Sequence, residues 1–409
     1  MTEMKRFVQI FLMLFASVFL LQGCSSEDKG RAKYIFLFVG DGMGFAHISA
    51  TESYLSYKNN TLGGEKLLFS KFPYVGIATT HSANRNVTCS SAAGTAIACG
   101  EKANNNTVGI NKDSVALKSV AYELRDMGYR IGIVTNVGVN HSTPATFYAN
   151  NSDRHAYYDI STQISKSGFD FFAGSGFYEP KGKDGSMEAI DKYLENRGYG
   201  VGYGVDEFKT KSLQFDKVVF CQERSRIEKP DYYTGNAKRE EDIALDQMLR
   251  LGLEHIGDEQ PMFIMCEGGN IDWASHNNKT MALVANVIEF ETAIKVAYDF
   301  YMNHKDETLI VVTADHETGG LTLGYGQGNE HPTYETIDWK TLEEHWISNG
   351  NKNTLSKDDN RKLNQECSIG WTSSHHTGGA VPVFAIGRGA EKFAGRMDNT
   401  DIKSKILGQ

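Results

Sequence analysis

The sequence predicts an α/β fold, a three-layer sandwich in which helices cover both faces of a mostly parallel central sheet. Short runs rich in β-branched and aromatic residues alternate along the chain with helical patterns. The runs are continuously apolar, as expected for strands that are buried on both faces. The predicted strands are 34–39, 74–79, 130–135, 217–220, 262–266, 308–313 and 381–386, and the predicted helices are 118–127, 240–256 and 281–301.

The first residues are interpreted as an export signal rather than as part of the fold. Two basic residues precede an apolar run, 7–21, that is short for a membrane span and has the layout of a secretory signal. The run ends in Leu-Gln-Gly-Cys, which resembles a bacterial lipobox, in which Cys24 becomes the lipidated first residue. We expect a signal peptide (1–23), a lipidated tether (24–33) and a lipid-anchored protein of the bacterial cell envelope, periplasmic or surface-exposed. The alternative is an ordinary signal peptide with a chance cysteine.

The remaining residues, 34–409, are expected to form one domain. Each predicted strand is a short apolar run, and each predicted helix carries apolar residues at helical spacing. In the longest helix these residues include Val284, Val287, Ile288, Ala293 and Ile294. The stretch 324–371 is richer in Asn, Lys, Glu and Gly and interrupts the pattern, so we interpret it as an insertion near the C-terminal end.

Composition excludes several classes of protein. Hydrophobic residues make up 40% and charged residues 23% of the chain, which is typical of a globular protein. The net charge of −9 argues against nucleic acid as a specific partner, although metal ions can still give a site a positive charge. The cysteines after Cys24 show neither regular spacing nor a C-x-x-C pair, so we expect no disulfide framework and no sulfur-bound metal.

Polar motifs follow the predicted strands, where α/β sheets bind their ligands. Asp41 lies in a Gly-Asp-Gly-Met-Gly turn after the first strand. Asp272 and His276 follow strand 262–266 at a spacing of four, which places both on one face of a helix. Asp315 and His316 follow strand 308–313, and His375 and His376 precede the last strand. Each motif alone could be a polar loop, but together they predict a site of mixed nitrogen and oxygen ligands that suits Zn²⁺.

A candidate nucleophile lies in the small-residue run 88–96, which is helical in character from Ser91 onward. Small side chains allow a helix N-terminus to approach an anion closely. Ser90 and Cys89 are both candidates, but no residue nearby in sequence supplies a His partner for Cys89. A tightly packed structural helix is the alternative interpretation of this run.

These motifs resemble those of alkaline phosphatase, the two-zinc phosphomonoesterase family. The Gly-Asp-Gly-Met-Gly turn, a Glu-Gly-Gly-x-Ile-Asp-x-x-x-His run and a Thr-Ala-Asp-His-Glu-Thr-Gly-Gly run occur in the family's order between Asp41 and His376. The resemblance implies hydrolysis of small phosphate monoesters to an alcohol and inorganic phosphate. It also implies an alkaline pH optimum and, since many members are dimers, a homodimer.

The resemblance also implies roles for individual residues. Ser90 matches the serine that becomes phosphorylated, and Arg154 matches the arginine that binds two phosphate oxygens. The implied ligands are Asp272, His276 and His376 for a first zinc; Asp41, Asp315 and His316 for a second zinc; and His141, Thr143, Asp41 and Glu267 for a third metal, usually Mg²⁺, with Zn²⁺ as the alternative.

Four positions depart from the family pattern or leave an ambiguity. Cys89 stands where many members carry an aspartate that orients the arginine, which predicts a more mobile Arg154. His141 replaces an aspartate, and Trp273 a lysine, of some bacterial members. His375 competes with His376 as the ligand, and the His-Thr-Gly context favours His376.

The sequence also bears on functions that compete with monoester hydrolysis. A sulfatase would need Cys or Ser followed by x-Pro-x-Arg, which neither Cys89 nor Ser90 has. A phosphodiesterase or a cofactor-independent phosphoglycerate mutase remains open within the wider superfamily. A non-catalytic phosphate- or metal-binding lipoprotein is the alternative from another class, and the complete set of candidate ligands argues against it.

Overall fold

The computed structural model describes residues 31–224, 242–325, 336–351 and 354–409. Residues Ala32–Gln409 form one compact unit. The predicted signal peptide and residues 24–30 of the predicted tether lie outside the described residues. Within the residues that the structure describes, no helix is both long and apolar enough to cross a membrane.

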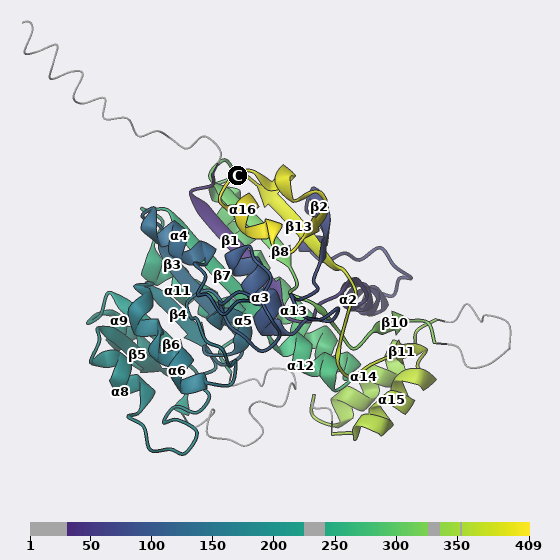
Figure 1. Cartoon of the computed structure of the whole chain (residues 1–409). Coiled ribbons are helices and arrows are strands. Elements are labelled where there is room, and N and C mark those ends of the chain that lie inside the picture. Colours follow the sequence, from purple (N-terminus) through teal and green to yellow (C-terminus); the bar gives the residue numbers. More distant parts are fainter. Residues whose placement is uncertain (1–30, 225–241, 326–335, 352–353) are drawn as a thin grey trace, which may run out of the picture. The chain divides into compact units, whose positions relative to one another are not determined.

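A ten-stranded sheet forms the centre of this unit (Figure 1). Its strands lie in the order β14 (Gly395–Asp398), β2 (Tyr74–Thr79), β13 (Val381–Gly387), β8 (Thr308–Thr313), β1 (Tyr34–Gly40), β7 (Met262–Gly268), β3 (Arg130–Thr135), β4 (Phe171–Gly174), β6 (Lys217–Cys221) and β5 (Tyr199–Tyr203). All pairings are parallel except those of β13, which runs antiparallel to both β2 and β8. The prediction of a mostly parallel sheet is confirmed.

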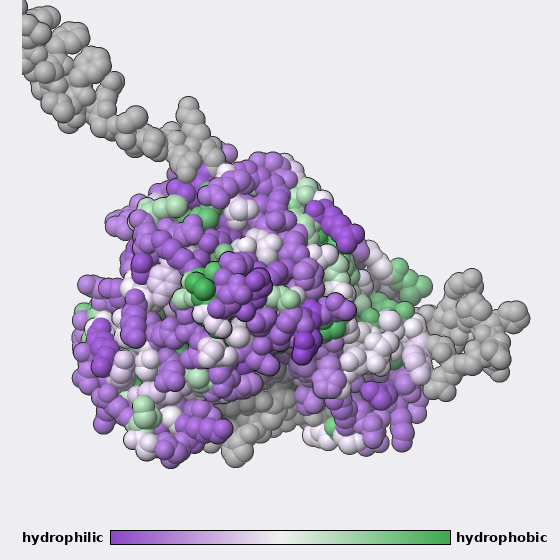
Figure 2. All heavy atoms as spheres, viewed as in Figure 1, coloured by the Kyte–Doolittle hydropathy of each residue, from purple (hydrophilic) through white to green (hydrophobic). Residues whose placement is uncertain are grey.

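Helices cover both faces of the sheet, as predicted. On one side lie α2 (Phe45–Lys58), α11 (Leu245–Ile256) and α13 (Thr280–Asn303); on the other lie α3 (Ser90–Cys99), α4 (Val120–Asp126) and α5 (Ser142–Ala145) (Figure 1). Every residue of β1, β7 and β8 is buried, because these central strands pack against helices on both faces. The face of the molecule seen in Figure 2 is mostly hydrophilic, in keeping with an apolar interior.

The seven predicted strands all occur, with boundaries that differ by two residues at most, since β7 extends to Gly268. β4, β5 and β14 were not predicted: β4 and β14 have only four residues each, and β5 contains two glycines. The predicted helix 240–256 begins at Leu245. Further elements are α6 (Tyr157–Thr162), α7 (Ile164–Ser167), α8 (Ile190–Glu195), α9 (Gly204–Ser212), α12 (Asn270–His276), α16 (Asp401–Ile406), β9 (Glu317–Thr318), β12 (His376–Thr377), and two short 3₁₀ helices, Phe69–Lys71 and Ala390–Phe393.

The described part of the 324–371 stretch contains two helices, α14 (Trp339–Ser348) and α15 (Lys357–Glu366). β11 (Ile369–Trp371) ends the stretch and pairs antiparallel with β10 (Leu321–Leu323). The stretch packs on α2: the Trp339 indole N–H donates to the Ser53 hydroxyl at 2.9 Å, and Glu343 accepts from Lys58 at 2.7 Å.

The direction of β13 decides which residues meet at the sheet edge. Asp41 follows β1, Asp272 follows β7, and Asp315 follows β8, so all three lie at the carboxyl edge of parallel strands. Because β13 is antiparallel, its N-terminal end lies at that same edge. The short strand β12, which precedes β13 and pairs with β9, therefore brings His376 to the same place.

Candidate active site and metal centre

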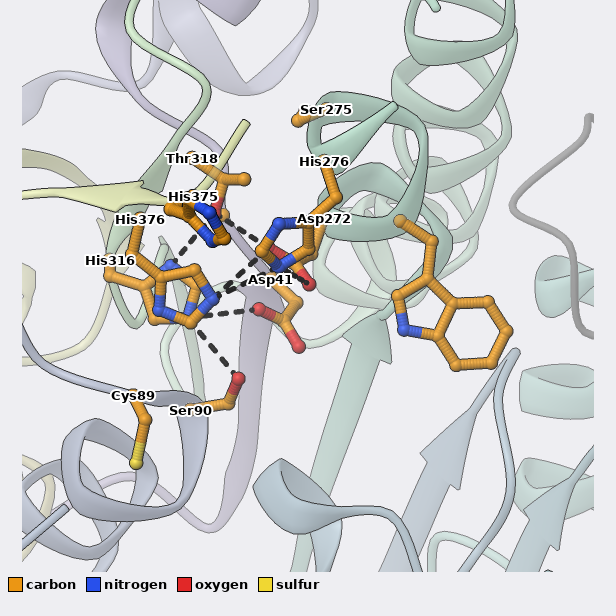
Figure 3. Close-up of polar contacts among 12 residues, drawn as sticks. Asp41, Cys89, Ser90, Asp272, Ser275, His276, His316, Thr318, His375 and His376 are labelled. Atoms are coloured by element: carbon orange, nitrogen blue, oxygen red, sulfur yellow. Dashed lines mark hydrogen bonds and ion pairs between the residues drawn. The ribbon is translucent and has the colours of Figure 1, made fainter. Parts of the chain in front are cut away.

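His276 and His376 lie side by side (Figure 3), with their rings tilted by 38° and their Nε2 atoms 3.2 Å apart. Each ring uses Nδ1 to donate to a carbonyl oxygen, that of Ser374 at 2.7 Å and that of Thr88 at 2.8 Å respectively. Both Nε2 atoms therefore present lone pairs to the same point. Asp272 adds its Oδ2 at 3.2 Å from Nε2 of His276 and its Oδ1 at 3.7 Å from Nε2 of His376. One atom from each of these three residues therefore lies close enough to the others for a single metal ion to bind all three.

His316 is the centre of a second cluster. Its Nε2 lies 3.4 Å from Oδ1 of Asp41, 3.2 Å from Oδ2 of Asp315, and 3.2 Å from the Ser90 hydroxyl. Its Nδ1 donates to the Thr318 hydroxyl at 3.2 Å, and that hydroxyl donates in turn to Asp272 at 2.6 Å. This chain fixes the tautomer, so the second cluster also presents an imidazole lone pair beside carboxylates.

A third cluster joins Asp41, His141 and Glu267. Nδ1 of His141 lies 4.0 Å from Oε1 of Glu267, and the Thr143 hydroxyl lies 3.5 Å from Oδ2 of Asp41. The Thr135 hydroxyl donates to the other Glu267 oxygen. Asp41 is shared with the second cluster, so the sites adjoin each other.

Several ligand atoms are buried with no hydrogen-bond partner among the described residues. They are Oδ1 of Asp41, Oδ2 of Asp315, Oε1 of Glu267 and Nδ1 of His141. Buried polar atoms are rarely left unpaired in proteins. All four point into the clusters just described, so the residues present fit divalent metal ions bound through nitrogen and oxygen.

The pKa shifts of the metal-free protein show the same need for positive charge. Burial, and the charges of neighbouring carboxylates, raise the pKa of Asp41 and of Asp315 well above the ordinary range. Burial also opposes ionisation of Asp272, but its hydrogen bond to His276 and the charges of His276, His376 and His316 together outweigh this and lower its pKa. Burial lowers the pKa of His276, but Asp272 outweighs it and raises that pKa overall. Asp272 thus favours positive charge on its neighbour His276, as it would favour a bound cation.

Ser90 enters the site from the first turn of α3. Its side chain is only 2% exposed and points toward the histidines, whereas the Cys89 sulfur points away from them (Figure 3). All residues of α3 are buried, and a Cβ on Gly94 would lie 2.9 Å from the Thr146 hydroxyl. The small side chains predicted to allow a close approach therefore pack α3 directly against the segment that follows α5.

Cys89 lies beside Arg154. The Cys89 sulfur is 3.1 Å from the Ser91 hydroxyl and accepts from the Asn106 N–H at 3.2 Å, while the Asn106 carbonyl accepts from the Arg154 N–H at 2.9 Å. Burial raises the pKa of the thiol, but the Arg154 charge and these donors outweigh it and lower the pKa overall. Nε of Arg154 is buried and has no hydrogen-bond partner in the described chain. Burial and the neighbouring carboxylates raise the pKa of Asp41, and the charge of Arg154 opposes this rise.

Comparisons with known proteins decide the family. The sequence profile of alkaline phosphatase matches residues 32–171 and 233–408. The chain belongs to the alkaline phosphatase family. It is 32% identical to alkaline phosphatase 4 of Bacillus subtilis, over 93% of this chain and 89% of that protein. It is 26% identical to an alkaline phosphatase of Schizosaccharomyces pombe, over 98% of this chain and 86% of that protein.

Solved alkaline phosphatases share the fold. The enzyme of the Antarctic bacterium TAB5 superposes with a TM-score of 0.72 at 26% identity, covering 92% of this chain and 97% of that one. An enzyme of a psychrophilic Shewanella gives 0.72 at 27% identity, covering 91% and 98%. The protein is therefore a phosphatase, a hydrolase with metal-binding residues.

Within this alkaline phosphatase fold, two neighbours of the candidate ligands are also placed. His375 is exposed and its ring centroid lies 6.3 Å from that of His276, whereas that of His376 lies 5.0 Å away and its Nε2 approaches Nε2 of His276 to 3.2 Å. The Trp273 ring meets His141 edge to face at 5.9 Å. The geometry thus favours His376 as a ligand and puts Trp273 beside the third cluster.

Sequence reasoning missed Thr318, which bridges Asp272 and His316. Thr318 lies two residues after His316 in the same motif. Residues two apart in a strand point to the same face, and this spacing could have identified Thr318 as a neighbour of the ligand. His47, Ser275 and Glu317 were also missed. They are adjacent or close in sequence to ligands, but only the fold shows that they contact one another.

Proposed function

We propose that the protein hydrolyses phosphate monoesters through a phosphoserine on Ser90, with two zinc ions and a third metal ion, Mg²⁺ or Zn²⁺. The observation that carries the proposal is the position of Ser90. Its hydroxyl lies 3.2 Å from Nε2 of His316, next to the candidate metal ligands. Bound metal would supply positive charge to the phosphoryl oxygens and to the entering and leaving oxygens.

The residues divide the chemistry as follows. The Ser90 oxygen forms a bond to phosphorus while the ester P–O bond breaks, and the alcohol departs with a proton. Water then forms a bond to phosphorus while the bond to Ser90 breaks, which releases inorganic phosphate and restores the hydroxyl. Arg154 binds two phosphate oxygens through its planar guanidinium, and the N-terminus of α3 adds favourable dipole charge.

We further propose that the third site differs from a magnesium site built on carboxylates. His141 supplies an imidazole nitrogen, which shifts the preference from Mg²⁺ toward Zn²⁺. The TAB5 enzyme offers a parallel, since its variants with a histidine replaced by glutamate or aspartate are described with Mg bound in the M3 site.

The location is also a proposal. We infer from the sequence of residues 1–24 that the protein is anchored in the bacterial cell envelope by a lipid on Cys24. Radiolabelled fatty acid should label the full chain and not a Cys24→Ser variant. Equal labelling of both would contradict the proposal, and size measurements on the soluble part would test the expected homodimer.

Hydrolysis assays test the central proposal. Protein lacking residues 1–24 should hydrolyse p-nitrophenyl phosphate, lose this activity in EDTA and regain it with Zn²⁺. Bis-p-nitrophenyl phosphate is the control substrate. Faster cleavage of the diester would indicate a phosphodiesterase, and full activity in metal-free protein would contradict a metal-dependent mechanism.

A further inference from the structure

Behind the candidate ligands lies a second layer of polar side chains. It consists of His47, Ser275 and Glu317, which are buried, and Thr377, which is partly buried. Three of these are sequence neighbours of candidate ligands: Ser275 precedes His276, Glu317 follows His316, and Thr377 follows His376. His47 comes from a different element, the first turn of α2, shortly after the loop that carries Asp41.

His47 connects the Asp41 loop to α12. It is 0% exposed, and its Nδ1 accepts from the Gly44 N–H at 3.1 Å. The Ser275 hydroxyl donates to the Ile271 carbonyl at 2.7 Å, so its oxygen accepts from Nε2–H of His47 at 3.2 Å. Both ring nitrogens are therefore used, and the tautomer is fixed. Burial lowers the pKa of this imidazole, which keeps the ring neutral.

Glu317 connects the other two ligand-bearing segments. Its carboxylate accepts from the Gly320 N–H at 2.9 Å and from the Thr377 hydroxyl, so it ties β9 to β12. It also presses against the Asp41 loop, because a Cβ on Gly44 would lie 2.4 Å from Cγ of Glu317. Its Oε1 lies 3.9 Å from Nδ1 of His47.

The two side chains together hold four segments that supply ligands from distant parts of the sequence. Burying an imidazole and a carboxylate is unfavourable unless their polar atoms are paired, and an apolar pair would pack as well. Unlike apolar contacts, hydrogen bonds depend on direction. Each hydrogen bond of His47 and Glu317 therefore fixes the position of a segment that carries a candidate ligand. Partners of this kind, which do not touch the metal, typically change metal affinity by about 10- to 100-fold.

We propose that His47 and Glu317 are positioning residues of the metal centre, acting through Ser275, Gly44 and Thr377 on the segments that carry the ligands. This proposal rests on the proposed metal-dependent function. It concerns the affinity for zinc, which is measured without substrate.

The test is a chelator competition that gives the zinc dissociation constants of the purified protein and its variants. Ser275→Ala removes one hydroxyl from the network and should weaken zinc binding by about 10-fold or more. His47→Leu should weaken it further. His47→Gln, which keeps an N–H donor at a similar reach, should recover most of the lost affinity.

The chain offers a matched control in Ser56. It is also a buried helical serine, it donates to the carbonyl four residues earlier at 2.9 Å, and it accepts a backbone N–H, that of Glu65, at 3.3 Å. Ser56→Ala should lower the melting temperature of the metal-free protein about as much as Ser275→Ala and leave zinc affinity unchanged.

The outcomes separate the two proposals. If Ser275→Ala and His47→Leu lower only the metal-free melting temperature, as the control does, the network is structural and this inference is wrong. Should His47→Leu not fold, Ser275→Ala still decides the matter. If the wild-type protein itself binds no zinc and hydrolyses no monoester, it is the proposed function that fails.

Discussion

Ser90 and Cys89 are neighbours in sequence with side chains that point in opposite directions, so only one of them can attack a phosphate held at the metal clusters. Ser90→Ala should abolish the acid-stable phosphoenzyme and lower kcat by at least about 10³-fold. Cys89→Ser should keep the phosphoenzyme. Acid-quenched labelling with radioactive phosphate distinguishes them, and a label on Cys89 would reverse the assignment.

Asp315 gives a prediction about pH. Its pKa in the folded, metal-free protein lies well above the ordinary value of 3.8, so ionising it opposes folding as pH rises above that value. Asp315→Asn should therefore stabilise the metal-free protein at neutral pH, and the advantage should shrink as pH falls and the native carboxyl becomes protonated. Denaturation at a series of pH values measures this. A difference that is constant with pH would contradict it.

The rings of His141 and Trp273 meet edge to face, and the resemblance implies that these residues replace an aspartate and a lysine of some bacterial members. The double change His141→Asp with Trp273→Lys supplies a carboxylate for Mg²⁺ and a cation for phosphate. We expect the double variant to retain more Mg²⁺ and to be inhibited more strongly by inorganic phosphate. Metal analysis and inhibition constants test this. If neither quantity moves while stability falls, Trp273 is only a packing residue.

At the scale of elements, the packing of α3 sets the position of Ser90 in the site. Its Gly94 lies against Thr146, so a larger side chain would push the helix, and Ser90 with it, away from the clusters. Gly94→Val should destabilise the protein by about 1–3 kcal/mol and lower kcat. Urea denaturation and kinetics measure the two effects. Unchanged kcat in the folded variant would show that α3 does not set the Ser90 position.

The same scale shows what sequence could and could not predict. β1, β7 and β8 were predictable because strands buried on both faces are continuously apolar, and the motifs after them follow from the geometry of parallel sheets. β5 was missed because its glycines weaken the strand pattern. His47 could not be predicted, because its role depends on α2 packing near α12, which is a tertiary contact without a local pattern.

At the scale of the whole molecule, bound metal should stabilise the fold, because the clusters join segments that are far apart in sequence. Zinc at 100 times its dissociation constant would add about 2.7 kcal/mol per site if it binds only the folded state. EDTA should therefore lower the melting temperature, and Zn²⁺ should restore it. Calorimetry with Ca²⁺ as the control ion tests this, and equal stability with and without zinc would contradict it.

The antiparallel strand β13 also has a consequence for the order in which the chain can fold. β2 is synthesised early, yet both of its partners in the sheet, β13 and β14, come from near the C-terminus. His376, just before β13, completes the first ligand cluster. A ribosome must therefore finish nearly the entire polypeptide before β2 can pair and before that cluster can close. Truncated chains carry most of the ligands but cannot assemble the cluster.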